Sequence, residues 1–350
     1  MRWRNAWPLL AVPVLLALAG CGSSGPTVVV YTAVDEDFSR PIVERFEKET
    51  GIKVRFVTDT EETKSTGLLG RLIAEKERPQ ADVFWSGDPV RTAVLKKHGC
   101  TAAYQSPSAK GLPPEYSDPE HHWTGFSARA RVLLINTQHE AIKQGSLPRS
   151  VRDLADPRFK GQACLANPLF GTTTVHAAAL FEVLGEDRAK QFFEDLLANG
   201  TRMLSSNGEV RRRVSNGEFA FGLTDTDDAA EAIRDGKPVR MVFPADDKEK
   251  AFGTLVIPNA VVLIAKGPNP ENGKKFIDYL LRPETEAELA KGGAAQIPLR
   301  PDVPVPAGMT PLRDLSPIAV DYGKLADRLE QLSAGYLADW VKRAPKQKSP

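Results

Sequence analysis

The sequence predicts a two-domain α/β protein with parallel sheets. Short β-branched runs alternate with amphipathic helical segments along most of its 350 residues, and this alternation indicates βαβ units. The length suggests about two domains. Apolar residues make up 41% of the chain, which is enough for a sizeable core, and a formal charge of +1 gives no sign of a nucleic-acid partner.

The predicted strands are short apolar runs bounded by glycine, proline or polar residues. Thr27–Thr32 begins the series with three consecutive valines, directly after Gly25 and Pro26. A continuous apolar run of this length indicates a buried strand. Further strands are expected at Ile52–Val57, Ala81–Trp85, Ala130–Asn136, Gln162–Ala166, Phe219–Leu223 and Gly253–Ile264.

The predicted helices carry apolar residues at helical spacing. Phe38–Thr50 repeats this spacing at Ile42, Val43 and Phe46, and it ends at Gly51, a good helix terminator. Further helices are expected at Gly67–Lys76, Val175–Leu184, Asp187–Asn199, Ala229–Asp235, Asn272–Leu281, Thr285–Lys291 and Tyr322–Trp340, with one more beginning near Glu209.

The N-terminus has the parts of an export signal. Arg2 and Arg4 precede the apolar run Trp7–Ala19, and small residues lead to a cysteine. The run is shorter than the about 20 residues that a transmembrane helix needs. Leu18–Cys21 resembles a bacterial lipobox, in which the cysteine is lipidated and becomes the new N-terminus; the alternative is an ordinary secretory signal. We therefore expect a protein of the cell envelope, periplasmic or extracytoplasmic, anchored to the membrane by lipid at Cys21.

Seven segments taken together resemble a known family. In chain order they read VVVYTAVDEDFSRPIVERFEKETGIKV, RPQADVFWSGDP, SARARVLLINT, DPRFKGQACLANPLFGTT, SNGEVRRRVSNGEFAFGLTDTDDAAEAI, GTLVIPNAVVLIAKGPNPENGKKFIDYLL and AAQIPLRPDV. Their order and spacing resemble the type II periplasmic solute-binding proteins, the substrate receptors of ABC importers. Within that class the chain is most similar to the ferric-iron-binding, bacterial-transferrin-like branch, and the resemblance spans residues 27–345.

The resemblance implies two α/β lobes joined by hinge strands, with a ligand cleft between the lobes. The hinge crossings are expected near Ser127–Val132 and Gly253–Ile257. Cys100 and Cys164 then fall in different lobes, so we expect free thiols. The expected division is a signal peptide at 1–20, a lipidated cysteine and flexible tether at 21–26, lobe one at 27–128 and 257–308, and lobe two at 129–256 and 309–350.

Carboxylates are candidates for one part of the ligand site. Open α/β sheets bind ligands beyond the carboxyl ends of their strands, and Asp35, Asp88, Asp225 and Asp227 all follow predicted strands. Carboxylates suit hard cations, and they suit polyhydroxy ligands equally well. The alternative is that such aspartates cap the next helix, and this is the simplest interpretation of Asp228.

The resemblance bears on the metal question. In the iron-binding branch adjacent tyrosines follow a strand of lobe two, and here Thr226 and Asp227 stand in their places. Asp35 stands where that branch often has a histidine. The iron ligands therefore do not carry over, and Asp35, Asp88 and Asp227 remain as candidate metal ligands.

Helix starts are candidates for binding an anion. Gly171, Thr172 and Thr173 precede one predicted helix and Asn207 precedes another, and backbone N–H groups at a helix start attract negative charge. In the family these regions hold a synergistic anion. Lobe one offers a similar start at Thr63–Thr66, with one positive charge. The full set of candidate ligand-binding residues is Asp35, Thr63, Lys64, Ser65, Thr66, Ser86, Asp88, Arg129, Gly171, Thr172, Thr173, Asn207, Thr224, Asp225, Thr226 and Asp227.

The expected function is solute capture for an ABC permease of the inner membrane by a monomer. No cofactor is expected, although ferric iron with a synergistic anion is one candidate cargo. A phosphorylated or carboxylated organic solute is the other. We expect no catalytic residues, because no catalytic or nucleotide-binding motif is present. A different class, an exported two-lobe hydrolase or a signalling module, stays open, because a fold does not fix a function.

Overall fold

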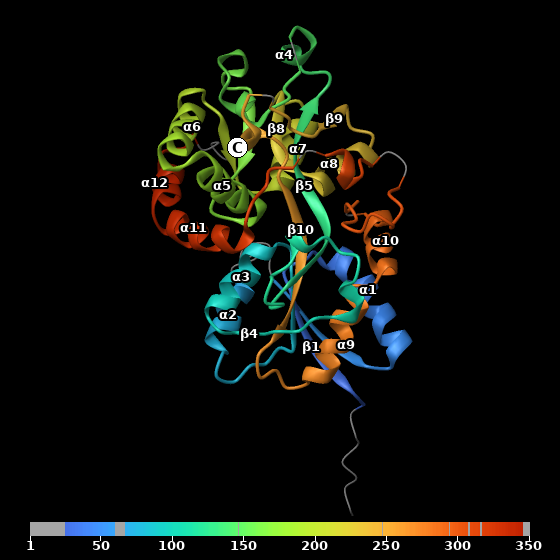
Figure 1. Ribbon diagram of the computed structural model, residues 1–350. Coiled ribbons are helices and arrows are strands. Elements are labelled where there is room, and N and C mark those ends of the chain that lie inside the picture. The colour runs from blue at the N-terminus through green and yellow to red at the C-terminus, as the bar shows by residue number, and fades with distance from the viewer. Residues whose placement is uncertain are drawn as a thin grey trace, which may run out of the picture.

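The computed structural model has two α/β lobes that lie one above the other (Figure 1). It describes residues 25–59, 67–145, 147–246, 248–293, 295–306, 309–315 and 317–345. Helices α1, α2, α3 and α9 surround the lower lobe, and α5 to α8 surround the upper one. Alternating strands and helices build both lobes, so the prediction of an α/β protein is confirmed.

The described strands form one continuous sheet. Their order is β2-β1-β3-β10-β5-β8-β6-β7, with β4 beside β10 and β9 beside β5. Pairs at the two ends of this order are parallel, whereas β3, β10, β5 and β8 pair antiparallel. The strands are β1 (Thr27–Thr32), β2 (Lys53–Thr58), β3 (Val83–Ser86), β4 (Thr101–Ala102), β5 (Thr124–Asn136), β6 (Ala163–Ala166), β7 (Arg202–Leu204), β8 (Phe221–Asp225), β9 (Val239–Val242) and β10 (Val256–Ile264).

Two long strands connect the lobes. The first half of β5 pairs with β10, and its second half, from Arg131 onward, pairs with β8 and β9. The far end of β10 pairs in turn with β3. A register shift between Pro258 and Asn259 lies opposite Ser127, whose φ is +40°. Such a bulge bends a strand locally, at the place where the chain passes between the lobes.

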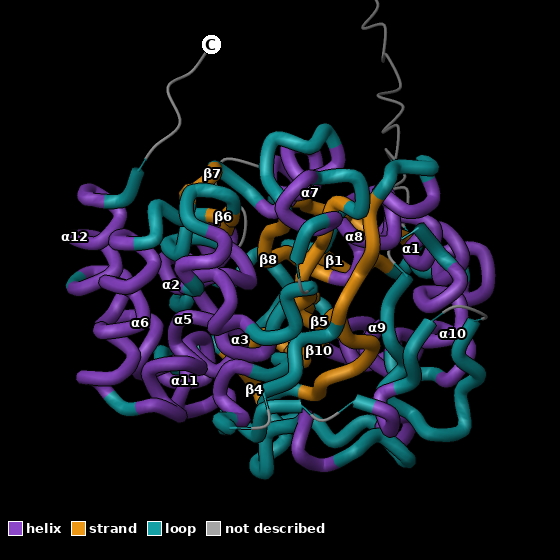
Figure 2. The backbone as a smooth tube through the Cα atoms, turned by 90° about the horizontal axis from the view of Figure 1, so that it is seen from above, coloured by secondary structure: helices purple, strands orange, loops and turns teal. Residues whose placement is uncertain are grey.

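Helices cover both faces of the sheet, as Figure 2 shows with α5, α6 and α11 on one side and α1, α9 and α10 on the other. The helices are α1 (Glu36–Thr50), α2 (Gly67–Ala74), α3 (Pro89–Lys97), α4 (Glu140–Lys143), α5 (Gly171–Leu184), α6 (Glu186–Ala198), α7 (Asn207–Ser215), α8 (Thr226–Arg234), α9 (Pro270–Leu280), α10 (Pro283–Lys291), α11 (Tyr322–Ala334) and α12 (Tyr336–Arg343). None of these described helices is long and apolar enough to span a membrane.

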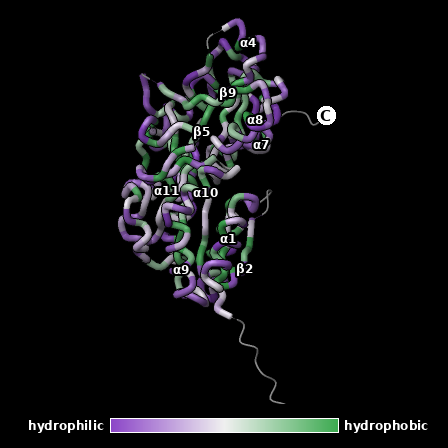
Figure 3. The backbone as a smooth tube through the Cα atoms, turned by 90° about the vertical axis from the view of Figure 1, so that its right-hand side faces the viewer, coloured by the Kyte–Doolittle hydropathy of each residue, from purple (hydrophilic) through white to green (hydrophobic). Residues whose placement is uncertain are grey.

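The C-terminal helix differs from its prediction. The prediction of a single helix over Tyr322–Trp340 is wrong, because the helix is interrupted at Gly335 and forms α11 and α12. Gly335 has φ −113° and ψ −111°, a backbone conformation outside the helical region. Helix α11 packs against both α3 and α5, and with α10 it lies at the level where the lobes meet (Figure 3).

Apolar packing holds each lobe together. On one face of the lower sheet Val28, Val30 and Trp85 pack with α1 and α9, and Trp85 is fully buried.

Cys100 and Cys164 are both buried and unpaired, in agreement with the expectation of free thiols. Burial raises the pKa of both thiols, which disfavours the reactive thiolate.

Candidate functional site

The register of β5 against β8 sets the site. Arg131 pairs with Asp225 across these antiparallel strands. Because side chains alternate along a strand, Arg129 lies on the same face as Arg131. Thr226 lies one residue beyond the end of β8, and its Oγ1 accepts a hydrogen bond from the backbone N–H of Ala130 in β5 at 3.2 Å. The strand spacing therefore brings two arginines of β5 to the carboxylates where β8 becomes α8.

Arg131 lies at the centre of a buried polar network. Its side chain has no exposed surface, and Nη1 donates to Asp225 Oδ1 at 2.6 Å. The same nitrogen lies 3.0 Å from Thr172 Oγ1 and 3.2 Å from Asn207 Oδ1, and Nη2 lies 3.2 Å from Thr173 Oγ1. A buried charge needs such partners, because taking it out of water is costly.

The second oxygen of Asp225 completes this network. Thr172 Oγ1 donates to Asp225 Oδ2 at 2.6 Å, and Asn207 Nδ2 donates to it at 3.1 Å. The side chains predicted to hold an anion are thus brought together, and they surround a carboxylate of the chain itself. Gly171 begins α5 with φ +58°, and a Cβ there would meet nothing within 4 Å.

Arg129 reaches from β5 toward lobe one. Its Nη1 lies 3.5 Å from Asp227 Oδ2, and both side chains are 14% exposed. A Cβ on Gly87 would lie 3.3 Å from Arg129 Nη2, so the glycine after β3 leaves room for the guanidinium. Burial opposes the charge of Arg129, but neighbouring carboxylates, Asp227 first and Asp35 among them, raise its pKa above the ordinary value. Arg129 thus lies between the strand ends of the two lobes.

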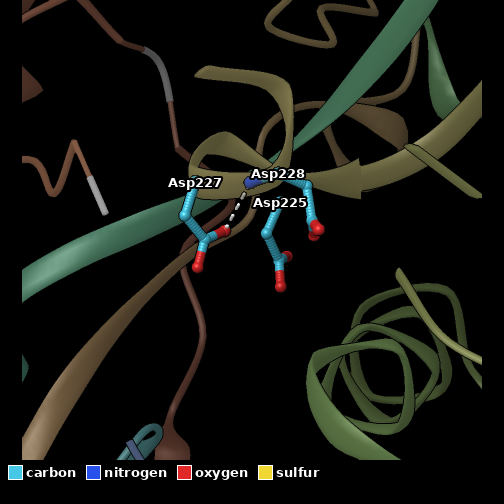
Figure 4. Close-up of side chains that lie close together, drawn as sticks. All are labelled: Asp225, Asp227 and Asp228. Carbon is cyan, nitrogen blue, oxygen red and sulfur yellow. Dashed lines mark hydrogen bonds between the residues drawn. The ribbon is translucent and has the colours of Figure 1, made fainter. Parts of the chain in front are cut away.

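Three carboxylates converge at the start of α8. Ligand oxygens of Asp225, Asp227 and Asp228 all lie within 4.8 Å of one another (Figure 4). Burial raises the pKa of Asp227. Burial, with the charges of Asp227 and Asp225, raises the pKa of Asp228 to about 8. Together they form a site that can hold a positively charged group.

Asp228 is not the cap of its helix. The prediction placed the helix start at Ala229, whereas α8 begins at Thr226 and Asp225 occupies the N-cap position. Asp225 makes no side-chain cap bond, because its carboxylate faces Arg131. Asp228 lies in the first turn and accepts a hydrogen bond from Thr224 Oγ1 at 2.9 Å.

Of the predicted residues of lobe one, Asp35 lies near enough to Arg129 to raise its pKa, whereas Ser86 and Asp88 form hydrogen bonds at the start of α3. Asp88 caps α3 by accepting from the Arg91 backbone N–H at 3.0 Å, and its other oxygen pairs with Arg91 Nη1 at 2.5 Å. The Asp88 backbone N–H donates to Ser86 Oγ at 3.3 Å. Asp35 is the N-cap residue of α1 without a side-chain cap bond. The predicted residues Thr63, Lys64, Ser65, Thr66 and Cys21 lie outside the described residues.

The tyrosine side chains are largely held by contacts of their own. Each of the six tyrosines lies in the described part of the chain and has its pKa raised, chiefly by burial. Five of their hydroxyls donate to other groups: Tyr31 to Glu75, Tyr104 to Asp278, Tyr279 to Glu49, Tyr322 to the Val256 carbonyl and Tyr336 to Glu194. The sixth ring, that of Tyr116, packs on Tyr322.

Sequence reasoning missed Arg131 and His176. A second arginine two positions after Arg129, in an otherwise apolar strand, is the signal that could have revealed Arg131. His176 is fully buried on α5, and neither ring nitrogen has a hydrogen-bond partner among the residues that the structure describes. Burial first, and the charge of Arg131 second, lower the pKa of His176 to about 3, which keeps this ring neutral.

Fold and site together define a two-lobe solute-binding protein. The chain belongs to the bacterial extracellular solute-binding protein family, which matches it over residues 78–319. Iron uptake protein A1 of Synechocystis sp. is 28% identical over 274 residues, which cover 75% of this chain and 73% of the relative.

Solved structures confirm the expected two-lobe fold. Iron-bound HitA from Pseudomonas aeruginosa has a TM-score of 0.80 at 21% identity and covers 90% of this chain and 99% of its own. AfuA from Actinobacillus pleuropneumoniae, with fructose-6-phosphate bound, has a TM-score of 0.77 at 25% identity. The match covers 92% of this chain and 99% of the AfuA chain. The class is defined by the binding of a solute.

Proposed function

We propose that this protein is the extracytoplasmic receptor of an ABC importer, tethered by a lipid on Cys21. It captures a small solute between its lobes as a monomer and delivers it to the permease. Membership of the solute-binding family and the export signal with its cysteine support this role. We also propose the predicted division into lobes, with closure about β5 and β10 on ligand binding.

The acidic cluster at the start of α8 is the observation that carries the choice of cargo. Arg131 is balanced by Asp225, and Arg129 lies beside Asp227. Asp228 adds a further carboxylate to the same cluster. Burial raises the pKa of Asp227 and Asp228, so a cargo that presents positive charge or hydrogen-bond donors to them would stabilise carboxylates that are disfavoured in the ligand-free protein.

Ferric iron is our first candidate cargo. Carboxylate oxygens suit a hard cation, and those of Asp227 and Asp228 lie close together beside Asp225. Binding would then rest on carboxylates, since five of the six tyrosine hydroxyls donate to groups outside this cluster. The name of the Synechocystis relative supports this choice. We propose no resident cofactor and no catalytic step.

A phosphorylated polyhydroxy solute is the second candidate. Arg129 and Asp227 lie side by side, so one ligand could place a phosphate on the guanidinium and hydroxyl donors on the carboxylate. The sugar phosphate bound to AfuA supports this alternative. The two candidates differ in metal content, which makes them separable by analysis of the purified protein.

Native mass spectrometry with elemental analysis tests the proposal. The protein is purified without refolding, as wild type and as Asp227→Asn, with Asp235→Asn at the exposed end of α8 as the control. We expect one bound cargo per chain in wild type and control, and reduced loading in Asp227→Asn. Iron identifies the first candidate and a phosphorus-containing adduct the second. Turnover of hydrolase substrates, or equal loading of all three proteins, would contradict the proposal.

A further inference from the structure

Three hydrogen-bond donors from three different elements converge on one carboxylate in lobe two. Thr172 of α5 and Asn207 at the start of α7 donate to Asp225 Oδ2, at 2.6 and 3.1 Å. Arg131 of β5 donates to Asp225 Oδ1 at 2.6 Å. A threonine hydroxyl and an amide at two helix starts, with an arginine, are the groups with which proteins bind an external oxyanion.

We propose that the Asp225 carboxylate is a resident anion, which fills the anion-binding position of lobe two so that the wild-type protein takes no external anion there. The inference concerns the site of the proposed function, but it stands on the ligand-free protein and its test needs no cargo. Asp225 is then a residue that determines specificity, since it decides that a cargo must be recognised elsewhere in the cluster.

Burial makes this arrangement stable. Arg131 has no exposed surface and Asp225 is 3% exposed, so little water can screen the pair. An arginine buried in this way needs a counter-charge, because removing one partner of a buried pair leaves an uncompensated charge. The β5–β8 register fixes the counter-charge opposite Arg131, and a group held by the chain loses no translational freedom on binding. An external anion would have to displace a carboxylate whose two oxygens both accept hydrogen bonds.

The arrangement predicts a specific chemical rescue. Asp225→Ala removes only the carboxylate and leaves Arg131, Thr172 and Asn207 around a vacancy of that size. Formate has the same carboxylate group and should occupy it. Asp228→Ala serves as the matched control. It removes a neighbouring carboxylate that accepts from Thr224 and is not a hydrogen-bond partner of Arg131.

The test is thermal unfolding in increasing formate against sodium chloride at equal ionic strength. We expect Asp225→Ala to melt below wild type and to gain at least about 2 °C in formate over chloride, since a ligand that binds only the folded state raises its stability. Wild type and Asp228→Ala should show no such gain. If Asp225→Ala does not fold during expression, refolding yields in formate and chloride decide in the same way, and formate should give the higher yield.

Three results would overturn the inference. The first is an Asp225→Ala variant as stable as wild type. The second is a destabilised variant whose melting temperature, or refolding yield, is the same in formate and chloride. The third is a wild-type protein that gains as much from formate as the variant does. A protein that fails to bind any cargo would contradict the proposed function and leave this result unaffected.

Discussion

Replacing Asp228 by asparagine should stabilise the ligand-free protein, and the gain should grow with pH. Burial, Asp227 and Asp225 together raise the pKa of Asp228 to about 8, against the opposing effects of Thr224 and Arg211. A carboxyl whose pKa is higher in the folded state favours folding fully below its unfolded pKa. That contribution is lost as the pH rises through the folded pKa. Asparagine never ionises, so the variant avoids the loss.

The size of the effect follows from the two pKa values. A pKa difference of 1 corresponds to about 1.4 kcal/mol. The rise from 3.8 to about 8 therefore sets an upper limit of about 6 kcal/mol at pH 8. Relaxation around the ionised group reduces this figure, and we expect a gain of at least about 1 kcal/mol at pH 8 and almost none at pH 4.

Urea unfolding at several pH values from 4 to 8 measures the effect. Asparagine keeps an oxygen that can accept from Thr224, so the helix start stays intact. Asp235→Asn, at the exposed end of the same helix, controls for the loss of one negative charge. The reasoning is refuted if the difference between Asp228→Asn and wild type is the same at pH 4 and pH 8, or if Asp235→Asn gives an equal change.

Three further changes test other parts of the account. Cys21→Ala should move the protein from the membrane pellet to the soluble fraction, and a variant that stays in the pellet contradicts the lipid anchor. Thr172→Val with Thr173→Val should lower the free energy of unfolding by about 2–3 kcal/mol, because two buried hydroxyls that contact the Arg131 guanidinium are lost. Urea unfolding measures this change, and an unchanged midpoint would count against the network. Asp88→Ala should cost about 3–5 kcal/mol, because Arg91 loses its buried partner. If that variant keeps its stability but loses cargo affinity, Asp88 belongs in the ligand site.

The fold could be predicted because most of its strands are continuous apolar runs. The strand Thr27–Thr32 has the bounds that the valine run indicates. β7 and β9 were missed because Arg202–Leu204 is only three residues long and Val239–Val242 is interrupted by Arg240. Local patterns of this kind disappear when a strand is short or half exposed.

Helix starts were predicted less well. Helix α5 begins at Gly171, four residues before the predicted Val175, because three threonines continue the helix although they carry no apolar periodicity. Helix α8 begins three residues before Ala229 for a similar reason. In both helices the early turn is polar because it faces the site, so hydrophobic spacing gives no indication of it.

Several residues of the buried network around Arg131 were candidates from the sequence, but their pairing could not be predicted. Strand ends and helix starts identified Thr172, Asn207 and Asp225 as candidates. Asp225 accepts hydrogen bonds from both Thr172 and Asn207 because Arg131 holds its carboxylate in place. Arg131 lies 94 residues away in sequence and reaches Asp225 only through the register of β5 and β8. Asp88 shows the opposite case, because its capping role is local and was considered from the sequence alone.

The affinity of wild type and of Asp227→Asn for the cargo found by native mass spectrometry tests the central claim most directly. Asp227 faces Arg129 between the strand ends of the two lobes, where we place the bound solute. Asparagine removes the charge and one acceptor oxygen of Asp227. A lost hydrogen bond to a charged group costs about 1.5–3 kcal/mol, which corresponds to a roughly 10- to 150-fold loss of affinity. Calorimetry should show at least a tenfold weaker cargo affinity for Asp227→Asn and no change for Asp235→Asn. An Asp227→Asn protein that binds its cargo within twofold of wild type would contradict the account.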